Sequence, residues 1–520
     1  MPHPEAGRLS KQVINTYLLE KEFEHPSSPV EKVKFGTSGH RGRLGSGFCR
    51  LHAQAIAQAV ARYHAENKIQ GPILVGGDTR LMSEETAKAC AEVLSGNGHE
   101  VVLADIPLPT PVFSSEILNG GAIASLNGTA SHNPPDDMGL KYNPSHGGPA
   151  GGEITSLIER FANEYLQSPR SIKRMPLSKA KAAGLLKKKD LVSPYLERLA
   201  KKVDLEAVKG SGLRIAIHPL GGTSIPFYKG IIDRGLSSMR IVDKTVDPGF
   251  GFIPLDHDGK IRMDPSSRYP MRPLLELVEK GKYDLAGASD PDADRFGAAT
   301  KKAGLISPNQ ALCILLHYLL KNRPDWPKTL QAGRTIGTTH LVDRIAKSFG
   351  REVHEVNVGF KYYVEGIRSD RYVMGGEESA GLSVFRWTTE KDGILAVMLL
   401  AEVMAKTGKD LSELYQDLVR EHGTPAYRRI DIPVDEATRA KLKGLKAASF
   451  KTLKSVAGEK VTGVRDTDGL KIYLEDSWVL ARPSGTEPIA KFYGESFRGE
   501  EHLKRVLSEG GALFGLDVRG

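Results

Sequence analysis

The sequence predicts four domains: three related α/β domains with mixed sheets, and an α+β domain at the C-terminus. The chain has 520 residues, which is more than a single hydrophobic core usually organises. Three stretches share one plan, in which an apolar strand ends in a Gly, Ser or Thr loop, a helix follows, and the chain returns to a second strand. After about Thr424 a different pattern begins. Strand, helix and strand in this order favour parallel neighbours covered by helices.

The three units differ in clarity. The first covers 71–105 and the second 212–243, while the third, over 329–356, is weaker. The C-terminal part predicts a strand at YRRIDIPV, a Lys-rich helix, a hairpin at GLKIYLEDSWVLARP and a final helix at EEHLKRVLSEGGALF. We place the domains at 1–203, 204–323, 324–425 and 426–520.

The composition is that of an ordinary soluble globular protein, with 40% hydrophobic and 26% charged residues. The net charge of +9, from 72 basic and 63 acidic residues, suits anionic partners. This excess is spread along the chain, and the densest run, 187–189, predicts a solvated turn. No basic face interleaved with aromatic residues is visible, so nucleic acid is not an expected partner.

The cysteines and the apolar runs indicate a cytoplasmic protein. Cys49, Cys90 and Cys313 are far apart and none belongs to a CxxC pair, which favours a reducing compartment over a disulfide framework or a thiolate zinc site. The N-terminal segment has no signal-peptide core. No apolar run, including ALCILLHYLL at 311–320, is long enough for a membrane span.

The strongest local signal is ASDPDADRFG at 288–297, directly after the apolar strand YDLAGA. In an extended loop Asp290, Asp292 and Asp294 would point to one side, where their carboxylates repel one another unless a cation lies between them. An EF-hand fails because its sixth position is Arg295 rather than Gly and its twelfth is a lysine. Three hard oxygen ligands favour Mg²⁺. The alternative is an Asp-rich turn that caps a helix.

A second loop, RPSGTEP, follows the strand SWVLA. Arg482 offers a fork of donors, Ser484 and Thr486 offer hydroxyls, and Gly485 lets backbone amides approach closely, which together suit a phosphate. A plain Pro-Ser-Gly turn explains the same letters equally well.

Two further loops carry weaker signals. GTSGHRG combines small residues with Arg41, which is compatible with phosphate. GGEESAG places Glu377 and Ser379 two positions apart, where they can hold vicinal sugar hydroxyls. A capping box for a following helix is an equally ordinary interpretation of that pair.

TASHNPP places Ser131 beside His132. Adjacent residues of an extended segment point to opposite faces, so His132 is poorly placed to accept the proton of Ser131. The G-x-S-x-G motif of hydrolases is also absent. A serine without a dedicated base, in a chain with a metal loop and phosphate-compatible loops, is better explained as a carrier of a phosphoryl group.

These motifs together resemble the α-D-phosphohexomutase superfamily, most closely its bacterial phosphoglucomutase branch. GTSGHRG, TASHNPPDDMGLKYNPSHGGPA, DPDADR, VGFKYYVEGI, GGEESAG, EKDGI and RPSGTEP occur in the family's order over nearly the whole chain. The resemblance implies four domains around a central cleft. It also implies interconversion of α-D-glucose 1-phosphate and glucose 6-phosphate through a phosphoserine and glucose 1,6-bisphosphate.

The resemblance also assigns roles to individual residues. Ser131 would be the phosphoserine and would complete the Mg²⁺ site of Asp290, Asp292 and Asp294. Arg41 and Arg295 would face phosphates, Glu377 and Ser379 the sugar, and Arg482, Ser484, Gly485 and Thr486 the distal phosphate. Lys141 and Lys391 match lysines at the active centre, and Val358 matches a position in the substrate loop.

Two points stay open at this stage. A base must accept the proton of the attacking sugar hydroxyl, and we expect Lys141, its pKa lowered by neighbouring cations, with His132 as the second candidate. Val358 stands where animal phosphoglucomutases have a threonine, so only a backbone contact is expected there. A second departure is the short loop after GGEESAG, with nine residues from Leu382 to Glu390 before KDGI, which is expected to alter how the sugar is held.

Three alternative functions compete with that of a mutase acting on glucose phosphate. One is a sister mutase acting on mannose or another sugar phosphate. The others are a non-enzymatic sugar-phosphate sensor and a metal-dependent phosphatase. The expected partners are small sugar phosphates, with Mg²⁺ and glucose 1,6-bisphosphate as cofactors, in a monomer or a homodimer that contacts neither membrane nor nucleic acid.

Overall fold

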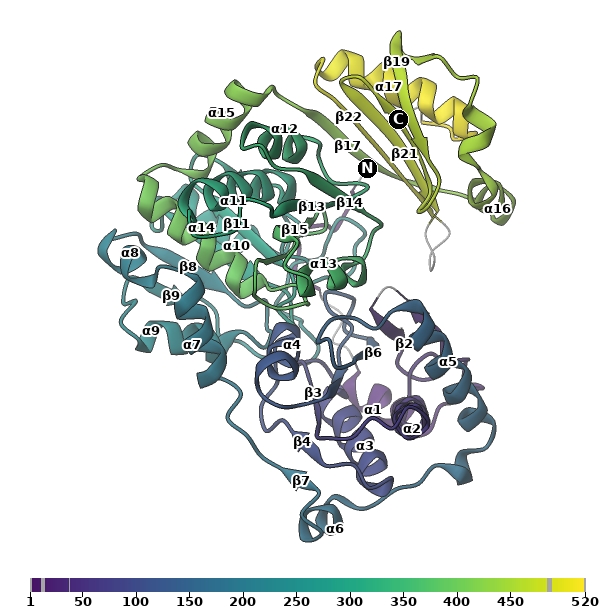
Figure 1. Cartoon of the computed structure of the whole chain (residues 1–520). Coiled ribbons are helices and arrows are strands. Elements are labelled where there is room, and N and C mark those ends of the chain that lie inside the picture. Colours follow the sequence, from purple (N-terminus) through teal and green to yellow (C-terminus); the bar gives the residue numbers. More distant parts are fainter. Residues whose placement is uncertain (1, 11–14, 37, 484–488, 519–520) are drawn as a thin grey trace.

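The fold is built around four β-sheets, one for each domain (Figure 1). The computed structural model describes residues 2–10, 15–36, 38–483 and 489–518. Over these residues the first three sheets are mixed and are covered by helices, and the last is antiparallel with two helices. The predicted fold class, three α/β domains followed by an α+β domain, is confirmed.

The first domain has a seven-stranded sheet in the order β1-β2-β6-β5-β3-β4-β7. Its strands are β1 Phe35–Gly36, β2 Gly39–Arg43, β3 Ile73–Gly77, β4 Val101–Leu103, β5 Ala124–Gly128, β6 Asp137–Asn143 and β7 Leu186–Lys187. Its helices are α1 Thr16–Glu24, α2 Arg50–Glu66, α3 Ser83–Gly96, α4 Thr110–Asn119, α5 Gly152–Gln167 and α6 Leu177–Ala182. The sequence RLHAQAIAQAVARYHAE makes α2 a strong helix former, and its small buried alanines let α3 and α5 pack closely against it.

The second and third domains pack against each other through one extended hydrophobic core. The strands of the second are β8 Ile215–His218, β9 Met239–Ile241, β10 Leu285–Ser289, β11 Phe296–Thr300 and β12 Gly304–Leu305, and its helices are α7 Ser193–Lys202, α8 Leu205–Gly210, α9 Ile225–Asp233 and α10 Arg272–Glu279. The third has β13 Gln331–Thr335, β14 Val353–Val356, β15 Tyr372–Glu377 and β16 Gly381–Val384, with α11 Pro308–Asn322, α12 Leu341–Ser348, α13 Val364–Arg368, α14 Gly393–Thr407 and α15 Leu411–His422. Helix α14 contacts β10 and β11 of one sheet and β16 of the other, which explains why its sequence is apolar on nearly every side.

One four-strand arrangement recurs in the first three sheets. The orders β6-β5-β3-β4, β11-β10-β8-β9 and β16-β15-β13-β14 are equivalent. In each, the predicted strand, helix and strand unit supplies the parallel pair at one side. In each, the other side is an antiparallel hairpin whose connection carries one of the polar motifs. The three chemical loops are therefore equivalent positions of a repeated fold.

The C-terminal domain is an antiparallel sheet in the order β17-β22-β21-β20-β19-β18. Its strands are β17 Ala426–Pro433, β18 Ser455–Val456, β19 Glu459–Arg465, β20 Leu470–Leu474, β21 Ser477–Pro483 and β22 Ile489–Ser496. Helix α16, Glu436–Gly444, and helix α17, Glu500–Phe514, pack on β21.

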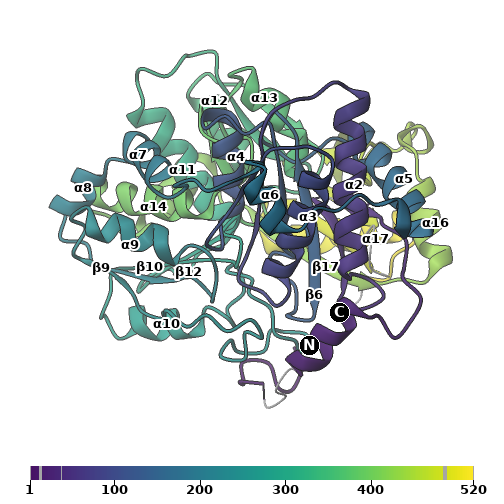
Figure 2. The same cartoon turned by 90° about the horizontal axis from the view of Figure 1, so that it is seen from below.

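The view from below in Figure 2 shows the N-terminal helix α1 on the first domain. In the described part of the chain, no helix combines the length and the apolar character that a membrane crossing needs.

A buried lysine lies at the junction of the third and fourth domains. The Nζ of Lys471, on β20, donates to the carbonyl of Ile336 at 2.7 Å and to Glu355 Oε2 at 2.9 Å. It also lies 4.2 Å from the centre of the Trp478 ring. The side chain is fully buried, and this burial, with repulsion from Arg334, lowers the pKa of Lys471 to about 7.

This lysine is expected to make stability depend on pH. Between pH 7 and its ordinary pKa of about 10.4 the unfolded chain holds a proton that the folded chain lacks, so the free energy of unfolding should rise with pH. One such proton contributes at most about 1.4 kcal/mol per pH unit. Lys471→Met should flatten this slope in denaturant titrations from pH 7 to 10, whereas Lys460→Met, at an exposed position of β19, should not. An unchanged slope in Lys471→Met would contradict the assignment.

Candidate active site

Ser131 lies in the connection between β5 and β6, and its hydroxyl contacts the second domain. Ser131 Oγ donates to Asp290 Oδ2 at 2.7 Å, and the side chain is buried. The segment is a turn and not the extended strand that the sequence suggested, because Ser131 has a φ of 54°. Thr129 Oγ1 stabilises this turn by accepting from the backbone N–H of Ser131 at 2.8 Å. The hydroxyl is therefore directed at the aspartates rather than at His132.

Arg80, which sequence reasoning missed, fixes the serine loop from behind. Its Nη2 donates to the carbonyl of Ser131 at 2.5 Å, and its Nη1 donates to the carbonyl of Asp137 at 2.6 Å. Its Nε donates to Asp78 Oδ2 at 3.0 Å, and both side chains of that pair are fully buried. The sequence offered one signal, the position of Arg80 in the loop after β3, at the carboxyl edge where α/β sheets hold ligands.

His132 faces the second domain. Its Nδ1 lies 3.4 Å from Asp264 Oδ2, and its carbonyl accepts from the backbone N–H of Met263 at 3.2 Å. Burial, with repulsion from Arg295, lowers the pKa of His132 to about 3. The imidazole is thus neutral and helps to seat the serine loop against residues 263–264. Asp264 is another residue that the sequence did not reveal.

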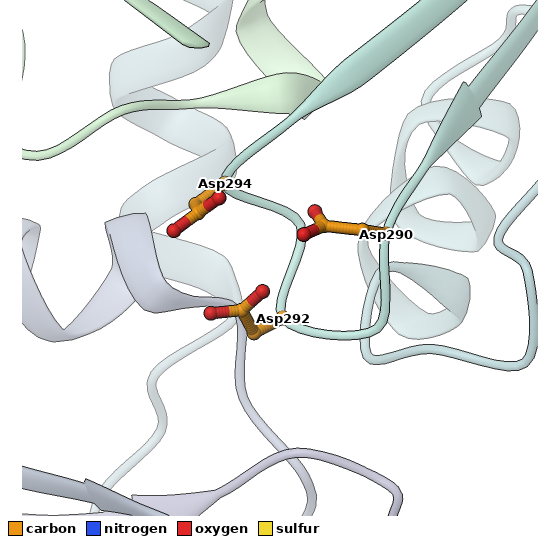
Figure 3. A group of neighbouring side chains, drawn as sticks. All are labelled: Asp290, Asp292 and Asp294. Atoms are coloured by element: carbon orange, nitrogen blue, oxygen red, sulfur yellow. The ribbon is translucent and has the colours of Figure 1, made fainter. Parts of the chain in front are cut away.

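The three aspartates of the second domain form one buried cluster (Figure 3). Asp290, Asp292 and Asp294 each offer a ligand atom, and these atoms lie within 4.8 Å of one another. They lie in the β10–β11 hairpin, so the interpretation as a helix cap is wrong. The loop is also not extended, since Ala293 has a φ of 52° and its N–H donates to the carbonyl of Asp290 at 2.8 Å. A tight turn, not strand alternation, brings the carboxylates together.

The cluster fits a divalent cation. Burial and the charges of the two neighbouring aspartates raise the pKa of Asp290 well above its usual range. Asp292 Oδ1 and Asp294 Oδ1 are buried and, among the described residues, have no hydrogen-bond partner. Buried carboxylate oxygens without partners are costly unless a cation binds them. Asp290, Asp292 and Asp294 could therefore hold a metal ion.

Lys141, on β6, contacts this cluster directly. Its Nζ donates to Asp292 Oδ2 at 2.7 Å and to Asp294 Oδ2 at 2.9 Å. Burial alone would lower the pKa of Lys141, but the two carboxylates outweigh burial and raise it. The predicted lowering of this pKa by neighbouring cations is wrong, because carboxylates surround the ammonium group.

Two arginines lie beside the serine and metal loops. Arg41, on β2, donates from Nη2 to Ser38 Oγ at 3.2 Å and from Nη1 to Asn133 Oδ1 at 3.5 Å. Arg295 donates its backbone N–H to Asp290 Oδ1 at 2.9 Å, and its Nη1 lies 3.7 Å from Asp264 Oδ2. Both are partly exposed, which leaves them able to meet an anion.

The GGEESAG loop of the third domain joins this group through a lysine. It is the turn between β15 and β16, so a strand and not a helix follows, and the capping-box interpretation is wrong. Ser379 Oγ donates to Glu377 Oε2 at 3.3 Å. The Nζ of Lys391 lies 3.8 Å from Glu377 Oε2 and 3.5 Å from Asp294 Oδ2. Glu390, also missed from sequence, is buried beside Lys391, and burial raises its pKa to about 7.

The remaining predicted residues lie at the junction with the fourth domain. Arg482 donates from Nε to Asp468 Oδ1 at 2.7 Å, and the backbone N–H of Val358 donates to Asp468 Oδ2 at 2.8 Å. The Val358 side chain packs against a hydrophobic cluster that joins the two domains and contains Ile336, Trp478, Leu480 and Tyr493. Ser484, Gly485 and Thr486 lie outside the described residues.

The structure therefore brings Ser131, the three aspartates, Lys141, Lys391 and Glu377 into one connected group from three domains. Val358 and Arg482 form a second group at the fourth domain. A buried hydroxyl beside a carboxylate cluster, with arginines nearby, is an arrangement suited to phosphoryl transfer. On three repeated α/β sheets followed by an α+β domain, it defines the class of phosphohexomutases.

The chain belongs to the phosphoglucomutase/phosphomannomutase family. Models of that family match its three alpha/beta/alpha domains at 32–168, 193–304 and 307–422, and its C-terminal domain at 432–509. The chain is 41% identical to a phosphoglucomutase of Komagataeibacter xylinus, over 96% of this chain and 93% of that protein. It is 28% identical to a phosphomannomutase of Mycoplasma genitalium, over 97% of this chain and 95% of that protein. Membership in this family makes the protein an enzyme of the mutase class.

A solved structure shows the same fold. The open form of the phosphoglucomutase parafusin from Paramecium superposes with a TM-score of 0.75 at 20% identity. The match covers 94% of this chain and 96% of that one. The fold over nearly the whole chain is therefore that of a solved member of the class.

Proposed function

We propose that the protein interconverts α-D-glucose 1-phosphate and glucose 6-phosphate through a phosphorylated Ser131 and glucose 1,6-bisphosphate. The contact of Ser131 Oγ with Asp290 Oδ2, at 2.7 Å across two domains, carries this proposal. The hydroxyl that would accept the phosphoryl group thus lies beside the carboxylate cluster, whereas the Thr129 hydroxyl of the same loop donates to Asp78 Oδ2. The identity of 41% with a phosphoglucomutase supports glucose as the sugar.

In this proposal Asp290, Asp292 and Asp294 hold Mg²⁺, which, when bound, would neutralise negative charge that develops on the phosphoryl oxygens. Arg80 and Thr129 fix the backbone of the serine loop, so that the hydroxyl is already oriented. Lys141 and Lys391 balance the remaining carboxylate charge with ammonium groups. His132, kept neutral, seats the loop on the second domain.

Substrate groups would be divided among the other loops. Arg41 and Arg295 would face the phosphate that is transferred, and Glu377 with Ser379 would hold sugar hydroxyls. Arg482, with Ser484, Gly485 and Thr486, would hold the distal phosphate, and Val358 would offer its backbone carbonyl to the substrate. The bisphosphate must fit both phosphate regions so that it can turn over between the two transfers. We also propose a cytoplasmic monomer or homodimer, and domain limits at 1–203, 204–323, 324–425 and 426–520, adjusted so that α7 belongs to the second domain and α11 to the third, because α7 packs on α9 and α11 packs on α12.

A coupled assay for glucose 6-phosphate tests the proposal. With Mg²⁺ and a catalytic amount of glucose 1,6-bisphosphate, the enzyme should convert glucose 1-phosphate, and EDTA should stop the reaction. Faster conversion of mannose 1-phosphate would assign the protein to the phosphomannomutases instead. Stoichiometric release of inorganic phosphate would indicate a phosphatase. Absence of turnover with every sugar phosphate would contradict the proposal and favour a sensor.

A further inference from the structure

We propose that Asp468 is a positioning residue that couples the distal phosphate-binding arginine to the sugar-binding loop. Asp468 lies in the turn between β19 and β20 of the fourth domain. Its Oδ1 accepts from Arg482 Nε and its Oδ2 accepts from the backbone N–H of Val358, at 2.7 Å and 2.8 Å. One carboxylate therefore holds a side chain of its own domain and a loop of the third domain. This inference rests on the proposed function, because Arg482 and Glu377 bind substrate only within it.

The turn that carries Asp468 is fixed in place on both sides. Gly469 has a φ of 81°, and a Cβ there would lie 2.4 Å from the carbonyl of Ala481 on the neighbouring strand. On the other side Arg465 donates from Nη2 to Asn357 Oδ1 at 3.0 Å, and Thr467 Oγ1 donates to the same oxygen at 3.1 Å. The position of Asp468 is thus set by the fold and not by Arg482 alone.

The bonds of Asp468 continue toward the sugar site. Val358 is followed by Gly359, whose N–H donates to Glu377 Oε1 at 3.1 Å. A continuous path therefore runs from Arg482 through Asp468, Val358 and Gly359 to Glu377. It joins the group expected to hold the distal phosphate to the group expected to hold the sugar hydroxyls. A hydrogen bond with an ionised partner constrains geometry more strongly than a neutral one, so Asp468 fixes the distance between the two contacts.

The apolar side chain at 358 fits this role. Val358 packs against Ile336, Trp478, Leu480 and Tyr493, so its side chain holds the loop on the fourth domain while its N–H is bonded to Asp468. The loop thus needs no side-chain hydrogen bond of its own to keep its place. Asp468 and the hydrophobic cluster together set where the sugar-binding loop meets the phosphate-binding domain.

Asparagine at position 468 should disrupt the coupling while preserving shape. Both groups bonded to Asp468 are donors, and an amide has a single acceptor oxygen, so one donor would face an NH₂ group. Because one of the two donors loses its charged acceptor, Asp468→Asn should raise KM for glucose 1-phosphate roughly tenfold. The kcat should change by less than about threefold, because Ser131 and the aspartates are untouched. The midpoint of thermal unfolding should stay within about 2 °C of the wild type, since the side chains of Arg482 and Asp468 are both partly exposed, at 19% and 20%.

Asp476→Asn is the matched control. Asp476 lies in the next turn of the same sheet, and its Oδ1 accepts from Arg344 Nη2 of the third domain at 2.6 Å, so it also bridges the two domains. It does not take part in the path to Glu377, and its variant should keep KM within about twofold of the wild type because exposed pairs contribute little. Equal increases of KM in the two variants, or an unchanged KM in Asp468→Asn, would overturn the inference.

A double-mutant cycle tests whether Asp468 acts through Arg482. Lysine lacks the Nε–H that Asp468 accepts from, so in an Arg482→Lys background Asp468→Asn should raise KM by clearly less than in the wild type. Fully additive effects would contradict the coupling. Calorimetric binding of glucose 6-phosphate separates this inference from the proposed function. If Asp468→Asn binds glucose 6-phosphate more weakly but the wild type shows no turnover, the mutase proposal is rejected and the positioning role stands. If the wild type converts glucose 1-phosphate but Asp468→Asn binds glucose 6-phosphate as the wild type does, the positioning role is rejected and the mutase proposal stands.

Discussion

Ser131→Ala is expected to lower kcat for glucose 1-phosphate by about 10⁴-fold or more, because no other group can carry the phosphoryl between substrates. The loss should be chemical and not structural. The serine loop is fixed through the backbone of Ser131, by Thr129 Oγ1 at its N–H and by Arg80 at its carbonyl. Removal of Oγ takes one hydrogen bond from the buried Asp290 carboxylate, so thermal unfolding is compared in Mg²⁺, where an ion bound to that carboxylate should leave it nearly unchanged.

Ser125→Ala provides the control for this substitution. Ser125 lies on β5, the strand that leads into the serine loop, and its Oγ is buried with no hydrogen-bond partner among the described residues. The variant should keep wild-type activity. Intact mass gives a second measurement, since a fraction of wild-type and Ser125→Ala protein should carry about 80 Da of added phosphate that Ser131→Ala lacks. Substantial turnover, or the same added mass, in Ser131→Ala would place the phosphoryl group elsewhere.

The repeated strand, helix and strand units were predictable because they depend on local patterns of apolar and small residues. Each unit proved to be a parallel pair, and in each of the first three domains one polar motif lies in the hairpin beside that pair. Ser131 and Asp290 are 159 residues apart in the sequence. The motifs predicted that their two loops act in one site, but they did not predict a direct hydrogen bond between the two side chains. Motifs identify which loops act together, whereas distances between them depend on how whole domains pack.

What could not be predicted depends on backbone conformation and on charge in three dimensions. Ser131 and Ala293 adopt positive φ, although neither is glycine, so their turns look extended from sequence. Lys141 was expected among cations and lies among carboxylates, because strand β6 places it opposite the metal loop. Arg80 and Asp468 act on backbone groups, and such contacts leave no motif in the sequence.

The aspartate cluster should respond to Mg²⁺ in a way that one substitution can reverse. In the wild type, Mg²⁺ should raise the midpoint of thermal unfolding relative to EDTA, because the ion binds only the folded arrangement of three buried carboxylates. Asp290→Asn should abolish most of this shift and lower kcat by about 10³-fold, the effect of several kcal/mol of lost charge stabilisation. Asp284→Asn, in an exposed pair with Arg214 just before β10, should keep both the shift and the activity.

Without metal, the same Asp290→Asn variant is expected to be more stable than the wild type, by about 1–3 kcal/mol. The raised pKa of Asp290 makes its ionised form costly in the folded chain without metal, and an amide, which does not ionise, avoids this cost. The amide can still accept from the Arg295 N–H and can donate to Ser131 Oγ, because a hydroxyl accepts as well as donates. Denaturant unfolding in EDTA measures the difference. A variant less stable than the wild type in EDTA, or one that Mg²⁺ stabilises as much as the wild type, would show that Asp290 serves the fold rather than the ion.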